Sequence, residues 1–284
     1  MRFANIDDRA CIAVGAQYFD IAEASGGRLS GDVQATYASW PDLIDWYASA
    51  FDPKGLTPVE GRLGAPAPAP SQAFGIGVNY ADHAQEAAFA LPKAPLVFPK
   101  FASCIVSPEQ PLPLDADTVD WEVELVVVIG RAARRVSKKD AWSYVAGLTV
   151  GQDISDRALQ FSDPANPQFG LAKSKFGYGP IGPVLVTPDE FDDPDKLAIS
   201  CSLNGELVQQ SNTSKLIFNV AALVSYLSTV VTLRPGDLIF TGTPSGVGMA
   251  RTPPRYLVVG DTLVSSIEGI GSIVTTTTRD DATW

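Results

Sequence analysis

The stretch from Val119 to Gly130, which reads VDWEVELVVVIG, constrains the fold more than any other part of the chain. Its second half, residues 125–129, is an apolar and mainly β-branched run, typical of a strand that is buried on both faces. If the strand extends back through Trp121, the two-residue period places Glu122 and Glu124 on one face. Two carboxylates about 7 Å apart on one strand face repel each other at neutral pH. Solvent, basic partners or a cation must therefore offset their charge.

This stretch by itself supports two interpretations. In the first, the carboxylates bind a divalent cation that prefers hard oxygen ligands, Mg²⁺ or Mn²⁺. In the second, they lie on the wet polar face of an edge strand, because a Glu-x-Glu pattern is common. Both interpretations stay open at this point.

Composition and charge exclude several classes of protein. The chain has 284 residues, of which 45% are hydrophobic, enough for one large domain or a large and a small one. A formal net charge of −11 without any Lys/Arg run argues against a nucleic-acid partner. No apolar stretch is long enough to span a membrane, and residues 1–15 lack the apolar core of a signal peptide. Three widely spaced cysteines form no metal motif, so we expect a reducing, cytoplasmic location.

The chain has a single histidine, His83. A histidine-rich zinc site is therefore excluded, and any catalytic triad with histidine must use this residue. Residues 81–90 favour a helix, on which His83 and Glu86 share a face because they are three residues apart. Such a pair can orient an imidazole for proton transfer, and the alternative is an ordinary pair on the surface.

Three further segments carry polar groups in positions that suit a site. Asp153 stands where a predicted strand ends, although it could also be a helix N-cap. Lys173 and Lys175 lie in a Gly- and Pro-rich segment, where they provide either positive charge for a ligand or a basic surface turn. Residues 241–248, TGTPSGVG, favour an anion-binding loop or a tight turn.

The pattern of elements predicts a mixed α/β protein that is predominantly β. Residues 1–70 are predicted to form a small N-terminal α+β domain, with short strands before residue 22 and a helix near residues 41–52. The Pro- and Ala-rich residues 61–72 then lead into a main domain, residues 71–284, with many short strands and few helices. A helix is expected over residues 138–146, a hairpin at Asn204-Gly205 and a capped helix in residues 211–230. Without regular β-α-β alternation, a β-sandwich or roll is favoured over a TIM barrel or Rossmann fold.

Six segments resemble the fumarylacetoacetate hydrolase family and follow the same order, over residues 72–276. They are GVNYADHAQE, VDWEVELVVVIGR, GQDISDRALQ, AKSKFGYGPIGP, SNTSKLIF and LRPGDLIFTGTPSGVG. The resemblance implies a mixed β-sandwich roll, a homodimer and one Mg²⁺ or Mn²⁺ ion per subunit.

The resemblance also implies roles for single residues. It implies that Glu122, Glu124 and Asp153 are the metal ligands and that His83, Glu86 and Lys173 are catalytic. We assign substrate contacts to Tyr80, Gln160, Lys173 and Thr243, and a closing lid to residues 82–95. Two positions depart from the family pattern, because Phe176 stands where many relatives carry an aspartate and Lys175 where an apolar residue is frequent. These departures are expected to reshape one wall of the pocket.

The resemblance implies a divalent-metal-dependent enzyme that acts on 2-oxo or 2-enol carboxylates. Hydrolysis of a carbon–carbon bond in a β-diketone acid of the acylpyruvate type is our first expectation, because the His83–Glu86 pair can activate water. Isomerisation of a 2-hydroxyhepta-2,4-diene-1,7-dioate or decarboxylation of a β-keto acid, in aromatic catabolism, is the alternative. A non-enzymatic metal-dependent scaffold or carbohydrate-binding sandwich would leave Lys173 and the His83–Glu86 spacing unexplained.

Overall fold

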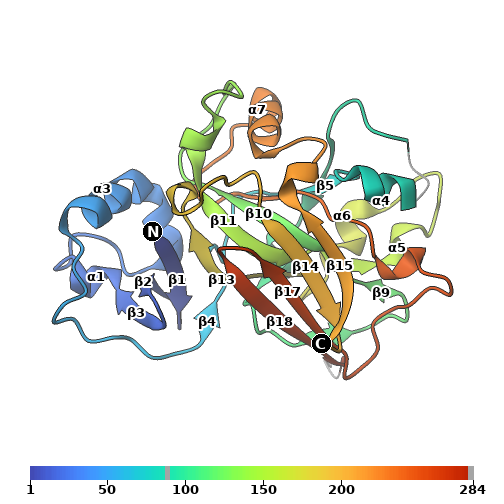
Figure 1. The fold of residues 1–284 in the computed structure, drawn as a ribbon, viewed down its shortest axis with the longest axis horizontal. Helices are drawn as coiled ribbons and strands as arrows, with labels where there is room; N and C mark the ends of the chain where they lie inside the picture. Colours follow the sequence, from blue (N-terminus) through green and yellow to red (C-terminus); the bar gives the residue numbers. More distant parts are fainter. Residues whose placement is uncertain (87–89, 281–284) are drawn as a thin grey trace.

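The computed structural model describes residues 1–86 and 90–280, which form three β-sheets and several short helices (Figure 1). The largest sheet has eleven strands in the order β3-β2-β1-β13-β11-β10-β16-β5-β6, with β4 beside β1 and β7 beside β13. Its strands are β1 (Arg2–Ile6), β2 (Arg9–Val14), β3 (Gln17–Asp20), β4 (Leu63–Gly64), β5 (Ala73–Gly77), β6 (Leu96–Lys100), β7 (Ile105–Val106), β10 (Val123–Ile129), β11 (Val145–Gln152), β13 (Gly179–Val186) and β16 (Leu238–Phe240).

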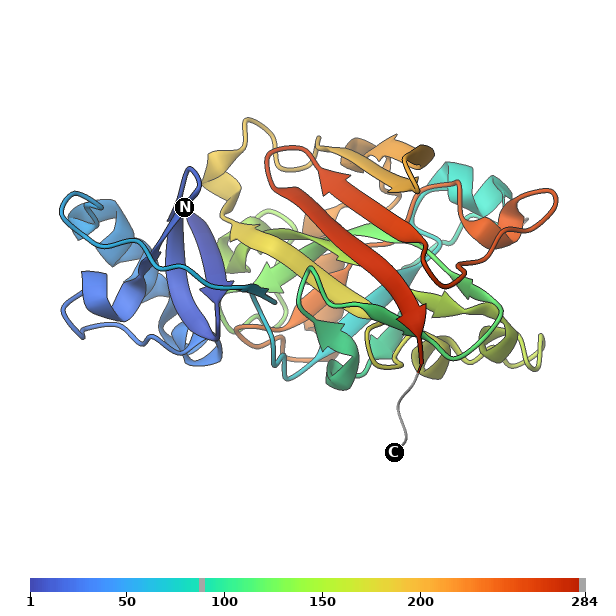
Figure 2. The same ribbon diagram turned by 90° about the horizontal axis from the view of Figure 1, so that it is seen from below.

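A second sheet of five strands packs on the first. Its order is β15-β14-β17-β18-β8, from β8 (Leu112–Leu114), β14 (Ala198–Leu203), β15 (Glu206–Asn212), β17 (Thr262–Ile267) and β18 (Gly271–Arg279). Strand β18 lies against β13, and β17 lies against β11, so two sheets enclose one core (Figure 2). A third, two-stranded sheet pairs β9 (Val119–Asp120) with β12 (Ser155–Asp156). The predicted class, a mixed and mainly β sandwich, is confirmed.

The helices are short and lie around the sheets. They are α1 (Ile21–Ala24), α2 (Val33–Thr36), α3 (Trp40–Ala50), α4 (Ala81–Glu86), α5 (Arg157–Gln160), α6 (Phe169–Ala172) and α7 (Val220–Val230). Turns of 3₁₀-helix occupy Tyr37–Ser39, Ala102–Cys104, Ala141–Tyr144, Pro188–Glu190, Thr213–Lys215 and Gly248–Ala250. Within the described part of the chain, none of these helices has both the length and the apolarity to cross a membrane.

Local sequence signals explain most of these elements. The Asn219 side chain accepts a hydrogen bond from the backbone N–H of Ala222 and so caps α7. Asn204 and Gly205 both have positive φ values, 52° and 84°, as a type I′ hairpin turn between β14 and β15 requires. The helix predicted over residues 138–146 is shorter than expected: only Ala141–Tyr144 is helical, as a 3₁₀ turn. The Ser137 hydroxyl binds the Asp140 side chain and holds the preceding residues in a turn instead.

Strand β10 lies at the centre of the large sheet, between β11 and β16, and all of its residues are buried. Its register with β11 places Val123 opposite Gln152, so Glu124 and Asp153 lie at the same end of the pair. The strand does not extend back through Trp121, as one form of the prediction assumed, but begins at Val123. The backbone N–H of Glu122 donates to the Gln152 side chain at 2.8 Å and not to a backbone carbonyl of a neighbouring strand, so the strand begins one residue later.

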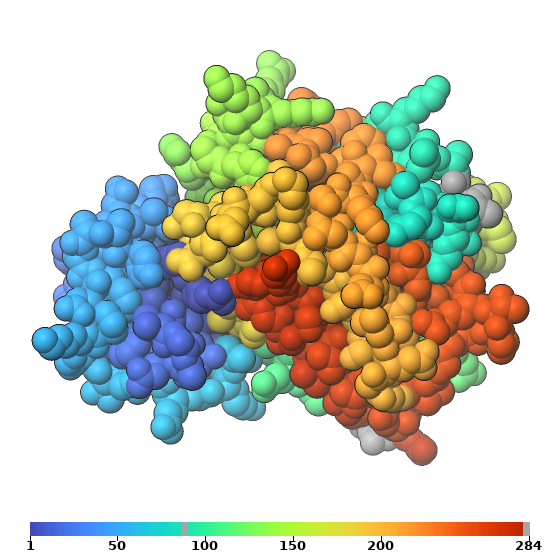
Figure 3. Space-filling model, viewed as in Figure 1, coloured from blue at the N-terminus to red at the C-terminus, as the bar shows by residue number. Residues whose placement is uncertain are grey.

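The first strands extend the large sheet. Strand β1 pairs with β13, with Phe3 opposite Leu185. The Phe3 ring packs edge-on against Tyr37 and Trp40, with ring centroids 5.8 and 5.3 Å apart. In Figure 3 the N-terminal residues, in blue, accordingly form one continuous surface with the rest of the molecule. The division of the chain between residues 70 and 71 stays a prediction.

Candidate metal centre and active site

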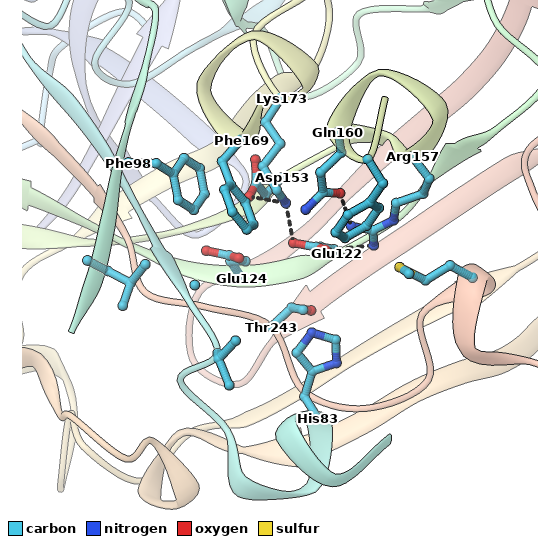
Figure 4. A pocket seen from close by; sticks show the side chains of 15 residues that line it. His83, Phe98, Glu122, Glu124, Asp153, Arg157, Gln160, Phe169, Lys173 and Thr243 are labelled. Carbon is cyan, nitrogen blue, oxygen red and sulfur yellow. Dashed lines mark hydrogen bonds and ion pairs between the residues drawn. The ribbon is translucent and has the colours of Figure 1, made fainter. Parts of the chain in front are cut away.

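Three buried carboxylates meet at the end of β10 and β11. Ligand oxygens of Glu122, Glu124 and Asp153 all lie within 4.8 Å of one another. Glu124 is in β10, Glu122 directly precedes that strand, and Asp153 directly follows β11. The backbone N–H of Asp153 donates to the carbonyl of Glu122 at 2.9 Å, so the strand pairing itself holds two of these residues together. Figure 4 shows the three side chains turned toward one space.

Lys173, which follows α6, lies over this carboxylate cluster. Its ammonium donates to Glu122 Oε2, to Asp153 Oδ2 and to the Ser155 hydroxyl, each at 2.7 Å. The ammonium also lies 5.5 Å from the centre of the Phe98 ring. The predicted active-site lysine therefore lies among the predicted metal ligands.

A second lysine, Lys100, was not predicted from the sequence. It ends β6, its side chain is fully buried, and its ammonium donates to Asp153 Oδ1 at 2.6 Å. The same ammonium donates to the backbone carbonyls of Lys173 and Tyr178. Burial lowers the pKa of Lys100, but the charge and hydrogen bond of Asp153, together with the charges of Cys104 and Glu124, outweigh burial and raise that pKa above its usual range. The only sequence signal was a lysine at the end of a largely apolar strand, which is a weak one.

Arg157 and Asp120 form a further buried ion pair that the sequence did not reveal. The Arg157 side chain donates to Asp120 Oδ2 at 2.8 Å, to Glu122 Oε1 at 2.7 Å and to Gln160 Oε1 at 2.8 Å. Asp120 also accepts hydrogen bonds from the backbone N–H groups of Gly248 and Met249. This pair therefore connects α5 to the loop that follows β16.

The electrostatics of the cluster suit a bound cation. Burial raises the pKa of Glu122, but the Lys173 and Arg157 charges outweigh burial and lower that pKa to about 2. Glu124 differs, because burial and the charges of Asp153 and Glu122 raise its pKa well above the usual range. Glu124 is the carboxylate that the neighbouring lysines neutralise least. A divalent cation would supply the missing positive charge.

The donor set fits Mg²⁺ or Mn²⁺. Three carboxylates offer hard oxygen atoms, which are the ligands that both ions prefer. Two hydrogen bonds orient these ligands, as partners outside the first coordination sphere do in metal sites. The Gly242 N–H donates to Glu124 Oε2 at 2.8 Å, and the Lys100 ammonium donates to Asp153 Oδ1. Glu122, Glu124 and Asp153 would hold the ion.

His83 lies across the pocket from the carboxylates (Figure 4). It is buried in α4, and its Nδ1 lies 3.4 Å from Glu86 Oε2. Glu86 in turn accepts from the backbone N–H of Gly246, at 3.0 and 3.1 Å from its two oxygens. The loop after β16 therefore holds Glu86, and Glu86 is within reach of the imidazole. The predicted lid, residues 82–95, includes residues 87–89, which lie outside the described residues.

Of the other three residues predicted to contact substrate, two line the pocket and one does not. Gln160 and Thr243 both line the pocket. The Thr243 hydroxyl donates to the Val123 carbonyl at 2.9 Å and accepts from Gln209 at 2.8 Å, so its rotamer is fixed. Tyr80 is not among the pocket-lining residues: it is fully buried, and its hydroxyl has no hydrogen-bond partner within residues 1–86 and 90–280. Burial and the charge of Glu124 raise its pKa, so this hydroxyl stays protonated.

The rest of the pocket wall is mainly apolar. It is formed by Ile76, Val78, Phe98, Phe161, Phe169 and Met249. The Phe98 and Phe169 rings stack with their centroids 5.6 Å apart. Lys175 and Phe176 are not among the pocket-lining residues, so any effect of these two departures on the pocket must be indirect.

Comparison with known proteins identifies the family of the chain. Residues 72–278 match the family model of the fumarylacetoacetate hydrolase C-terminal domain. The chain is 45% identical over 212 residues to the mitochondrial oxaloacetate tautomerase Fahd2a of Rattus norvegicus, covering 74% of this chain and 67% of the relative. It is 48% identical over 216 residues to a fumarylacetoacetate hydrolase domain-containing protein 2 homologue of Dictyostelium discoideum, covering 72% and 70%.

Two solved structures show the same fold over nearly the whole chain. An HpcE-like protein of Mycobacterium smegmatis is 48% identical, with a TM-score of 0.94 over 99% of this chain and all of that one. Maleylpyruvate hydrolase of Sphingobium sp. SYK-6, solved with manganese(II) and pyruvate, is 26% identical, with a TM-score of 0.81 over 98% and 99%. The chain belongs to the fumarylacetoacetate hydrolase family.

Proposed function

We propose that this protein is a divalent-metal-dependent enzyme that interconverts the keto and enol forms of a small 2-oxo acid of the oxaloacetate type. The observation that carries the proposal is the meeting of three carboxylates, Lys173 and the only histidine in one pocket. Support comes from several relatives at 43–45% identity that are named oxaloacetate tautomerases.

The metal and Lys173 would each contribute to substrate binding. When bound by Glu122, Glu124 and Asp153, Mg²⁺ or Mn²⁺ would supply Lewis acidity to a 2-oxo carboxylate. Lys173 lies beside these ligands and would hold negative charge on the substrate. Gln160 and Thr243 offer polar groups at the pocket wall, and the aromatic side chains Phe98 and Phe169 limit access of water.

His83 is the candidate acid–base group. In the keto-to-enol direction its imidazole would take the proton from the carbon next to the keto group and deliver a proton to the keto oxygen. In the enol-to-keto direction it would take the proton from the enol oxygen and return one to the same carbon. Glu86, fixed by the Gly246 N–H, would hold the imidazole in place. His83 lines the same pocket as the three carboxylates, and its Nδ1 lies 3.4 Å from Glu86 Oε2.

Hydrolysis of an acylpyruvate-type β-diketone acid is the second candidate. The same His83–Glu86 pair would take a proton from water, and the resulting hydroxide would add to the distal carbonyl. The carbon–carbon bond would then break, and the leaving enolate of pyruvate would take up the proton held by His83. The maleylpyruvate hydrolase with 26% identity favours this activity. Isomerisation of a hydroxydienedioate and decarboxylation of a β-keto acid use the same enolate chemistry and remain alternatives.

A spectrophotometric assay distinguishes these activities. Enol-oxaloacetate and an acylpyruvate would each be followed with Mg²⁺, with Mn²⁺ and with EDTA, beside the Glu122→Gln variant. Metal-dependent decay of the enol absorbance without pyruvate release supports the tautomerase. Metal-dependent release of pyruvate from the acylpyruvate supports the hydrolase. If neither substrate reacts faster with enzyme and metal than with metal alone, both proposals are wrong.

Assembly and location remain proposals as well. We propose a homodimer that takes a small 2-oxo acid, without nucleic acid or membrane partners, in the cytoplasm. Light scattering after size-exclusion chromatography tests the dimer, since a mass near the 30.1 kDa of one chain would contradict it.

A further inference from the structure

Lys175 makes two ion pairs outside the pocket. Its ammonium lies 2.7 Å from Asp115 Oδ2 and 2.9 Å from Asp156 Oδ2. The Lys175 side chain is 27% exposed, and the side chains of Asp115 and Asp156 are 37% and 6% exposed. The buried Tyr178 side chain completes the arrangement, because its hydroxyl lies 3.3 Å from the other oxygen of Asp115.

Asp156 is the N-cap residue of α5 and directly precedes its first residue, Arg157. Its carboxylate caps the helix by accepting from the Leu159 N–H at 3.2 Å, and it also accepts from the Thr118 hydroxyl at 3.0 Å. The α5 helix has only four residues, and two of them, Arg157 and Gln160, line the pocket. A shift of the Asp156 cap would therefore move both pocket residues.

Lys175 also belongs to the segment that carries Lys173. Its backbone carbonyl accepts from the Tyr178 N–H at 3.1 Å, which closes a turn two residues after Lys173. The side chain of Lys175 therefore ties the segment of Lys173 to the helix of Arg157. Arg157 and Lys173 bind the two oxygens of the Glu122 carboxylate. Arg157 donates to Oε1 and Lys173 donates to Oε2, each at 2.7 Å.

We propose that Lys175 is a positioning residue, which sets the separation of the cationic groups Arg157 and Lys173 around the anionic substrate. It acts through Asp156 and touches no residue that we expect to bind the metal. The proposal rests on the proposed function. It states that Arg157 and Lys173 bind the negative charge of the substrate acid and that Lys175 maintains the distance between them.

The test compares Lys175→Met and Lys175→Arg with a matched control, Lys196→Met. Lys196 is also a surface lysine in an ion pair, with Asp193, but its side chain is 66% exposed and it does not line the pocket. Oxalate, a small analogue of a 2-oxo carboxylate, would be titrated into each Mn²⁺-loaded protein by calorimetry. Hydrogen exchange would be measured over residues 157–161 and 173–178 without oxalate, and the thermal midpoint would confirm folding.

We expect Lys175→Met to weaken oxalate binding by about three- to tenfold, since two partly exposed ion pairs are lost. We also expect faster exchange in residues 157–161 and 173–178, a thermal midpoint close to that of the parent, and recovery of both readouts in Lys175→Arg. In the oxaloacetate assay the loss should appear in KM more than in kcat. The Lys196→Met protein should match the parent in every readout.

Hydrogen exchange that is the same in Lys175→Met as in the parent would overturn the proposal. If the parent binds oxalate, an oxalate affinity of Lys175→Met equal to that of the parent would also overturn it. If the parent itself does not bind oxalate, the proposed function fails, and the exchange measurement alone then decides the role of Lys175. Equal losses in Lys175→Arg and Lys175→Met would also contradict it, because the positive charge would then not matter.

Discussion

Lys100 and Lys173 hold the two oxygens of a single carboxylate, that of Asp153, at 2.6 and 2.7 Å. The Lys100 ammonium also donates to the backbone carbonyl of Lys173, so one lysine fixes the main chain of the other. Because both lysine side chains are buried, with exposed fractions of 0% and 3%, both depend on the carboxylates for their charge balance. Four carboxylates, those of Glu122, Glu124, Asp153 and Asp120, face three cations, Lys100, Lys173 and Arg157. The cluster is therefore short of positive charge, which a divalent cation would supply.

Lys100→Met is predicted to destabilise the protein strongly. Removing one partner of a buried ion pair leaves the other uncompensated, which typically costs about 3–5 kcal/mol. Urea unfolding of the metal-free variant measures this loss, with Lys196→Met as the exposed control, for which we expect no measurable loss. Similar losses in the two variants would show that the Lys100 pairs add nothing to stability.

Glu124→Gln is predicted to stabilise the metal-free protein while abolishing its response to metal. The pKa of Glu124 is raised, so its charged form is disfavoured in the folded state. Its contribution to stability therefore falls as the pH rises from its ordinary value of 4.5 through the raised folded pKa. The free energy of unfolding in EDTA should favour the variant more at pH 8 than at pH 5.

The response to metal provides the control for this prediction. Mn²⁺ should raise the thermal midpoint of the parent and leave that of Glu124→Gln unchanged, since binding to the folded state alone stabilises it. The amide of glutamine can still accept from the Gly242 N–H, so loss of that hydrogen bond would not explain the difference. A gain in stability that does not vary with pH would contradict the pKa argument.

His83→Ala is predicted to lower kcat by about 10²–10⁴-fold, the usual contribution of general acid–base catalysis. Mn²⁺ affinity should stay within about threefold of the parent, because His83 is not among the three expected ligands. Glu86→Gln should cost less, since it removes only the group that orients the imidazole. Steady-state kinetics and calorimetry measure these quantities, and near-parental turnover in His83→Ala would refute the assignment.

Gly246→Ala is predicted to reduce both stability and turnover. Gly246 has a φ of +106°, and a Cβ at this position would meet the backbone carbonyl of Val208. Strain of this kind costs about 1–3 kcal/mol, and its relief would move the N–H that holds Glu86.

Gly260→Ala is the matched control for that variant. Gly260 has a similar φ of +93°, but a Cβ there would enter open space. We therefore expect a loss of stability without a loss of turnover in Gly260→Ala. Equal turnover in the two variants would indicate that the contact between Gly246 and Glu86 has no role in catalysis.

The sequence by itself determined the elements whose signals are local. The β-branched run in residues 125–129 predicted the buried strand β10, and the asparagine–glycine pair predicted the hairpin between β14 and β15. The motifs around Glu122, Glu124, Asp153, His83 and Lys173 predicted a shared site, and the structure brings all five into one pocket. These residues lie in segments with distinctive composition, so their pattern could be read without knowing the fold.

Only the tertiary structure revealed the ion pairs around that site. Lys100 lies 53 residues before Asp153, and Asp120 lies 37 residues before Arg157, so no periodicity connects either pair. Asp120 and Arg157 meet because β9 pairs with β12. Lys100 ends β6 at the edge of the large sheet and reaches Asp153, although β5, β16 and β10 lie between β6 and β11. The polarity of a side chain is local information, but its charged partner is chosen by strand order and register, which long-range packing decides.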